Sequence, residues 1–303
     1  MTERVGTAIS LGIACIGTIN NTFSISFFLR RKNGSIGDKF MIFVNTLDTI
    51  ICLWLLLVLS LTVQSQEKGV GSPAYNFGIW TIFGMLIELS GLATCFLCAL
   101  RTISINWPLY QINKTKVYIL AVLAVAYIII FRSVCFHPIL KNDIIEKGQA
   151  GEVSFVGISS FCNISFMIVF VLVCSIASTK ALLKTRPEMS GQRSERNEKA
   201  TKMVLILGLL FVTFNTVWII LKLTYYLATD DDGEREGSTK NSGVQGIVTY
   251  IITCTNSAVN PIVYMTRNAE MNDYLKQTFL QVTNVICKPC SPNRVQEEVK
   301  IDQ

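Results

Sequence analysis

The stretch from Val244 to Thr266, VQGIVTYIITCTNSAVNPIVYMT, contains no charged residue. A helix needs about 20 mostly apolar residues to cross the hydrocarbon core of a bilayer, so this stretch is long enough to span a membrane. Its second half nevertheless carries a dense set of polar and helix-breaking residues: Asn256, Ser257, Asn260, Pro261 and Tyr264. Asn256 and Asn260 are four residues apart and therefore share one face of a helix. Because amides in lipid need hydrogen-bonding partners, the stretch predicts a polar cluster inside a membrane-spanning bundle.

Six further stretches of the chain are similarly long and apolar. With the first, they predict spans at about 5–29, 40–64, 74–105, 117–138, 153–183, 200–227 and 244–266. Half of the 303 residues are hydrophobic and only 16% are charged, too few to cover the surface of a soluble domain, where about 25% is usual. Only helices and closed barrels satisfy every backbone group in lipid, and the stretches lack the alternation of barrel strands. The sequence therefore predicts an all-α membrane protein, a seven-transmembrane helix bundle.

The distribution of basic residues predicts the direction of insertion. Of the 27 lysines and arginines, 19 fall on the connections that share a side with the C-terminus, and the other eight fall on the opposite side. Because basic residues are retained in the cytosol, the N-terminus is expected outside and the C-terminus inside. Basic cytosolic loops also favour contact with anionic membrane lipids, and the net charge of +6 requires no nucleic-acid partner.

Two carboxylates lie inside the predicted spans, Asp48 in the second and Glu88 in the third. A charged side chain in the hydrocarbon region is costly, so by default it marks a functional site. Asp48 with the amides and hydroxyls of the seventh span forms an oxygen-rich set that suits a hard cation and water. The alternative is a structural, hydrogen-bonded Asp48. Glu88 is either a counter-ion for a basic ligand or a structural hydrogen-bonding residue.

The segment Asn256–Tyr264 resembles the NSxxNPxxY signature of rhodopsin-like (class A) G-protein-coupled receptors, at the inner end of the seventh of seven spans. Asp48 resembles the second-helix aspartate of that family, and Arg101 resembles the arginine of its DRY motif. Phe214 and Trp218, which are four residues apart, resemble the toggle pair of the sixth helix. The resemblance covers the whole chain, but its most specific part is the seventh span.

The resemblance implies a multi-pass receptor of the plasma membrane, a divergent and orphan-type member of the family. Such a receptor binds an extracellular small-molecule or peptide ligand in its helix bundle and activates a heterotrimeric G protein in the cytosol. The residues implied for ligand binding are Phe83, Glu88, Trp218 and Lys222. Those implied for activation and G-protein coupling are Arg101, Phe214, Trp218, Asn260, Pro261 and Tyr264. No cofactor is implied other than an allosteric Na⁺, for which the family's pocket corresponds to Asp48, Ser90, Asn256, Ser257 and Asn260. The alternative is a water-filled polar cluster without a functional ion.

The resemblance also implies a single receptor domain over residues 1–282 and a cytosolic tail over 283–303. Within that domain, Arg267–Phe279 is expected to form a short amphipathic helix along the membrane surface, because its apolar residues gather on one face. Cys287 and Cys290 follow this helix and are candidates for palmitoylation.

Several positions depart from the family pattern. Leu100 stands where the family has the acid that restrains the arginine, and Thr102 stands in place of the following tyrosine. The resemblance therefore implies a weakened restraint on Arg101 and raised basal activity. Ile220 replaces a proline of the sixth helix, and no cysteine near Tyr75–Trp80 is available for the disulfide of the outer face.

Other classes of protein remain as alternatives. A chemosensory seven-helix receptor of another family would share the architecture. A transporter or channel should show paired discontinuous helices or a row of charged residues along a pathway, whereas the predicted interior contains only Asp48 and Glu88. An enzyme is not expected, because the chain has one histidine and no nucleophile–base set.

Overall fold

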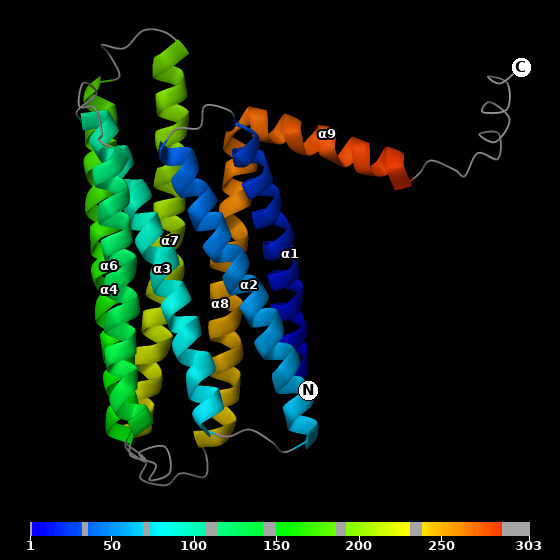
Figure 1. The fold of residues 1–303 in the computed structure, drawn as a ribbon, viewed down its shortest axis with the longest axis vertical. Helices are drawn as coiled ribbons and strands as arrows, with labels where there is room; N and C mark the ends of the chain where they lie inside the picture. The colour runs from blue at the N-terminus through cyan, green and yellow to red at the C-terminus, as the bar shows by residue number, and fades with distance from the viewer. Residues whose placement is uncertain are drawn as a thin grey trace, which may run out of the picture.

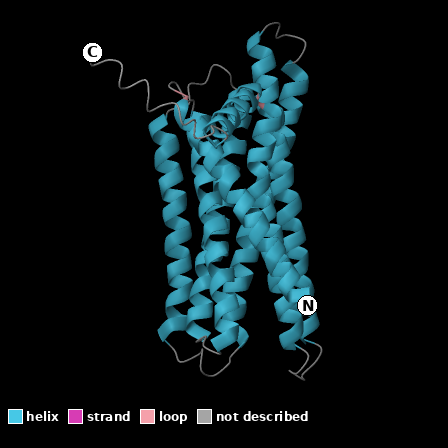
Figure 2. Ribbon diagram, turned by 90° about the vertical axis from the view of Figure 1, so that its right-hand side faces the viewer, coloured by secondary structure: helices cyan, strands magenta, loops and turns pink. Residues whose placement is uncertain are grey.

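The fold is entirely helical in the part of the chain that the computed structural model describes, residues 2–31, 36–68, 73–106, 114–141, 150–185, 192–230 and 238–286. The helices are α1 (Thr2–Arg30), α2 (Ile36–Lys68), α3 (Pro73–Asn106), α4 (Lys114–Lys141), α6 (Ala150–Thr185), α7 (Gln192–Asp230), α8 (Ser238–Arg267) and α9 (Ala269–Ile286). The prediction of an all-α protein is confirmed. All helices except α9 run side by side along the long axis, and α9 leaves the bundle sideways at one end (Figures 1 and 2).

Five of these helices are long and apolar enough to cross a membrane. The qualifying segments are Val5–Arg30, Ile36–Ser60, Ile82–Asn106, Ser160–Leu183 and Glu198–Leu221. The protein is therefore embedded in a membrane by helices, as the sequence predicts. α4 contributes a shorter apolar segment, Thr115–Ile130, and α8 carries the amides and hydroxyls that make it less apolar. The count of seven crossings and their direction stay predictions.

The third helix is the centre of the bundle. α3 packs against α2, α4, α6 and α7, whereas α1 packs against α2 and α8. Because α8 also contacts α2 and α7, the helices α2, α3, α6, α7 and α8 form a closed ring, against which α1 and α4 pack. Side chains on the outside of α4 and α6 are large and apolar, such as Val122, Phe166 and Val173, which suits a surface in contact with lipid.

Close packing of α1 depends on a small residue. A Cβ atom built on Gly17 would lie 2.7 Å from Sγ of Cys52 on α2 and 3.2 Å from Cβ of Ala258 on α8. Small residues at such positions let membrane helices approach closely and gain van der Waals contact. This approach brings the middle of α1 against the polar half of α8.

Hydroxyl groups on the lipid side of the bundle are satisfied within their own helices. Thr22 donates a hydrogen bond of 2.8 Å to the carbonyl oxygen of Thr18, and Thr46 donates one of 2.8 Å to that of Ile42. Each bond reaches back one helical turn, so no partner from another helix is required. The polar side chains that do reach across helices are therefore the informative ones.

Candidate functional site

The buried carboxylate of Asp48 joins three helices. Asp48, on α2, is fully buried, and its Oδ1 accepts a 2.8 Å hydrogen bond from the Ser90 hydroxyl on α3. Its Oδ2 accepts a 2.7 Å hydrogen bond from Nδ2 of Asn260 on α8. Hydrogen bonds to an ionised carboxylate are stronger than neutral ones, especially away from water. The sequence prediction that Asp48 finds partners on the seventh span agrees with this geometry.

The proline of α8 creates a second link, to α1. Pro261 has no backbone N–H, so the carbonyl of Ser257, four residues earlier, has no helical donor. Nδ2 of Asn21 donates a 3.0 Å hydrogen bond to that carbonyl oxygen and a 2.8 Å bond to the carbonyl of Gly17. Asn21 is completely buried. The side chain of Asn21 therefore replaces the bond that Pro261 removes and fixes α1 to α8 one turn before the proline.

The oxygen donors around Asp48 fit a small hard cation. Ser257 is buried on α8, three residues before Asn260. Asn256 lies one turn before Asn260 on α8 and is half-buried. Two carboxylate oxygens offer about four lone-pair sites, so the two hydrogen bonds of Asp48 leave capacity for an ion. No group of three His, Cys, Asp or Glu side chains gathers among the described residues.

A separate polar cluster lies around Arg101, at the end of the bundle where α9 leaves. Nε of Arg101, on α3, donates a 2.9 Å hydrogen bond to the Thr201 hydroxyl on α7, and Thr201 is fully buried. The next residue, Thr102, lies 2.9 Å from the Ser178 hydroxyl and 3.1 Å from the carbonyl oxygen of Cys174, both on α6. Adjacent residues of α3 are thereby tied to α6 and to α7, and Arg101, Ser178 and Thr201 line one narrow hollow.

Thr201 and Ser178 are site residues that the sequence did not predict, and Thr102 stood out in the sequence only as a departure from the family pattern. Leu100 stands where an acid would pair with the arginine, which led to the expectation of a weakened restraint. In the structure a hydroxyl from α7 contacts the Arg101 guanidinium instead. The sequence holds little signal for this pairing, because Thr201 is one of several threonines and only the rotation of α7 directs it toward α3.

Replacing Thr201 should loosen this end of the bundle. If the chain acts as the G-protein-coupled receptors that its sequence resembles do, Thr201→Ala is expected to raise guanine-nucleotide exchange in the absence of ligand by about three- to tenfold. A hydrogen bond to a charged group contributes about 1.5–3 kcal/mol, and the substitution removes part of that contribution. Thr201→Ser keeps the hydroxyl and is the matched control. The measurement is guanine-nucleotide exchange on membranes at equal surface expression. Equal exchange in all three proteins would show that the bond restrains nothing.

The other predicted site residues occupy the interior of the bundle to different degrees. Phe83 and Glu88 are buried on α3, and the Phe83 ring lies 5.9 Å from the Tyr250 ring on α8 in an edge-on arrangement. Phe214 and Trp218 are half-buried on α7, one turn apart. Lys222 lies on the same helix, but its side chain is outside the described part of the structure, as are Cys287 and Cys290.

Tyr264 is the most completely buried large side chain of α8. It is 0% exposed, and its ring meets the Phe28 ring of α1 edge-on at 5.8 Å between centroids. The path along α8 from the Asp48 network toward the Arg101 end thus passes Asn260, Pro261 and Tyr264 in turn.

Comparison with protein-family models and with curated proteins gives no match to this chain. Its function is therefore argued from the geometry of the Asp48 and Arg101 clusters.

Proposed function

We propose that the protein is a rhodopsin-like G-protein-coupled receptor that crosses the plasma membrane seven times. The observation that carries the proposal is the hydrogen bond between Asp48 and Asn260, which ties the Asn256–Tyr264 segment to the second helix. The buried carboxylate of α2 and the proline and tyrosine of α8 together form an element that can hold two arrangements. Enzymatic activity is not part of the proposal.

The geometry suggests how ligand binding would reach the cytosol. Phe83 and Trp218 lie on α3 and α7, on the side of the Asp48 network away from Arg101, where an extracellular ligand would bind with Glu88 and Lys222 as its polar contacts. A ligand that binds better when α7 has shifted would stabilise that shifted state. Movement of α7 separates Thr201 from Arg101, which frees the guanidinium for carbonyl groups of a heterotrimeric G protein. The two polar clusters then act as one two-state system.

A sodium ion would act on the resting arrangement. Asp48, Ser90 and Asn260 would hold it, with Ser257 and Asn256 as further oxygen donors. Its positive charge would neutralise a carboxylate that is expensive to bury. Because the donors come from α2, α3 and α8, their present separation suits the ion only while these helices remain in place.

A transporter or channel has less support. Among the described residues, Asp48 and Glu88 are the only charged side chains that are buried, and they make no continuous path across the bundle. Ion pathways are expected to contain rings or rows of charged or carbonyl groups.

The seven-span arrangement is tested by the position of the two termini. We expect an epitope tag at the N-terminus to bind antibody on intact cells, and a tag at the C-terminus to bind only after permeabilisation, because seven crossings place the termini on opposite sides and 19 of 27 basic residues mark the cytosolic one. Antibody binding to both tags on intact cells, or to neither, would contradict an odd number of crossings.

A further inference from the structure

The cytosolic end of α1 presents aromatic rings to α9. The ring of Tyr274, on α9, lies 5.0 Å from the ring of Phe23 and 5.6 Å from that of Phe27. The guanidinium of Arg30 lies over the Tyr274 ring at 5.1 Å from its centroid. These separations lie within the ranges in which aromatic pairs and cation–π contacts are attractive. Tyr274 is therefore the residue through which α9 docks on α1.

The same end of α1 also contacts α8, through the next residue. Phe27 and Phe28 lie 5.2 Å apart in an edge-on arrangement, and Phe28 lies 5.8 Å from Tyr264. Consecutive residues of a helix point about 100° apart, so one ring faces α9 and the other faces α8. Four rings, those of Tyr274, Phe27, Phe28 and Tyr264, form a continuous series from α9 to the buried tyrosine, which we call the ring series.

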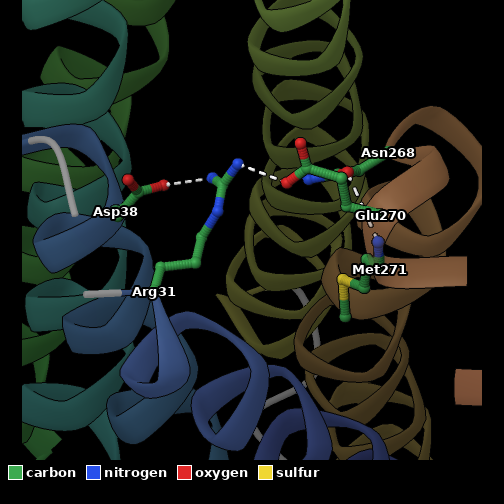
Figure 3. Close-up of polar contacts among 5 residues, drawn as sticks. All are labelled: Arg31, Asp38, Asn268, Glu270 and Met271. Atoms are coloured by element: carbon green, nitrogen blue, oxygen red, sulfur yellow. Dashed lines mark hydrogen bonds and ion pairs between the residues drawn. The ribbon is translucent and has the colours of Figure 1, made fainter. Parts of the chain in front are cut away.

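Ion pairs set the orientation of α9 beside this series. Nη1 of Arg31 lies 3.1 Å from Oδ1 of Asp38, and its Nη2 lies 2.6 Å from Oε2 of Glu270. Figure 3 shows the guanidinium between the two carboxylates. Asp38 and Glu270 both lie in the first turn of a helix, α2 and α9, where a negative charge is favourable. Arg31 thus joins the starts of two helices.

The relative strength of these contacts follows from their exposure. The side chains of Arg31 and Glu270 are 37% and 61% exposed, so salt screens the pair and its contribution to stability is small. The rings of Phe27, Phe28 and Tyr264 and the side chain of Met271, which is 0% exposed, are buried, and the Tyr274 ring is half-buried. The start of α9 is fixed further by Asn268, whose Oδ1 accepts a 3.4 Å hydrogen bond from the Met271 backbone N–H. Ring packing therefore holds α9, and the ion pairs orient it.

We propose that the ring series is a latch in which the docking of α9 on α1 holds Tyr264 in its buried position. The Tyr264 ring can leave that position only if Phe28 or another neighbour moves. Loss of the contact between Tyr274 and Phe27 frees the end of α1 and loosens the packing of Phe28 on Tyr264. The position of α9 thereby controls the mobility of the last turns of α8. This coupling is a property of the isolated protein and holds whether or not the protein activates a G protein.

Hydrogen–deuterium exchange on the full chain in lipid nanodiscs, without ligand or G protein, tests the latch. We expect Tyr274→Ala to speed amide exchange about tenfold in α9 and also in the segment 262–266 of α8. Phe279→Ala is the matched control, because Phe279 is an aromatic residue of α9 that is 70% exposed and outside the ring series. It should change neither segment. Phe28→Leu should speed exchange in 262–266 while α9 stays protected.

Two outcomes would overturn the latch. One is a Tyr274→Ala protein in which α9 exchanges faster and 262–266 does not change, because the two segments would then be uncoupled. The other is an equal acceleration by Phe279→Ala, because loss of any ring on α9 would then suffice. If Tyr274→Ala cannot be purified, Phe28→Leu and Tyr274→Phe answer the same question. Tyr274→Phe keeps the ring and should leave both segments unchanged, so acceleration by it would reject ring packing as the cause.

Discussion

Arg101→Ala is expected to lower G-protein activation about 10- to 150-fold while the protein still reaches the cell surface. This range follows from a charge-assisted hydrogen bond, which contributes about 1.5–3 kcal/mol, with 1.4 kcal/mol per factor of ten. In the resting structure the Arg101 guanidinium donates to Thr201. In the proposed active state it donates to the G protein, so removing it costs the complex its charged donor. Nucleotide exchange at matched surface expression measures the effect.

The direction of the Arg101→Ala result separates two roles of this residue. If Arg101 served only to hold α7 through Thr201, then Arg101→Ala would raise exchange as Thr201→Ala does. If it contacts the G protein, the two variants move exchange in opposite directions. Arg101→Lys is the control for charge, because lysine keeps a positive group but loses the Nε donor that reaches Thr201. Exchange that rises in both alanine variants would contradict the contact with the G protein.

Asp48→Asn should abolish any effect of sodium on signalling. In the wild-type protein we expect sodium at about 0.15 M to lower ligand-free nucleotide exchange relative to a choline buffer of equal ionic strength. The effect should lie between about 5- and 150-fold, since coupling between two sites typically amounts to about 1–3 kcal/mol. Asparagine keeps the shape of the side chain and its contact with Asn260, but it lacks the charge that binds the ion. Ser90→Ala removes one donor and should weaken the sodium effect without eliminating it.

A flat response of the wild-type protein would reject the ion switch. In that case the hydrogen bonds from Ser90 and Asn260 alone would account for the burial of Asp48. A sodium effect that persists in Asp48→Asn would place the ion elsewhere. Neither result bears on the hydrogen bond from Arg101 to Thr201, which lies at the end of the bundle where α9 leaves.

The fold and one of the two clusters could be predicted because lipid leaves few choices. Long stretches without charge must be helices, and a carboxylate within one of them needs a partner from another. Asp48 and Asn260 were therefore expected together, and the structure places them 2.7 Å apart. The link from Asn21 to the Ser257 carbonyl follows from a similar argument. The position of Pro261 in the sequence identifies the Ser257 carbonyl as the one that lacks a helical donor.

The Arg101 cluster and the ring series could not be predicted in the same way. Both depend on which faces of neighbouring helices meet. The spacing of apolar residues along one helix does not indicate how the neighbouring helix is rotated about its own axis. Thr201 and Ser178 are ordinary hydroxyl residues in sequence, and many such residues only donate to their own helix, as Thr22 does. Phe27 and Phe28 look like two apolar residues of a span until α8 and α9 are placed on either side of them.

Arg31 has two roles, and its place in the sequence indicates only one of them. In the sequence its charge contributes to the assignment of the cytosolic side. In the structure the same charge bridges carboxylates of α2 and α9. A basic residue at a helix end supports the direction of insertion whichever acid it meets, so the topological argument gives no information about its partner.

The most direct test of the account is GDP release from purified heterotrimeric G proteins of each class by the protein in lipid nanodiscs, with Thr201→Ala as the sensitised form and Arg101→Ala as the inactive one. We predict that Thr201→Ala accelerates GDP release from at least one class more than the wild-type protein does, and that Arg101→Ala fails to accelerate it. No acceleration of any heterotrimer by the wild-type or Thr201→Ala protein, with the helical fold intact by circular dichroism, would contradict the assignment as a G-protein-coupled receptor.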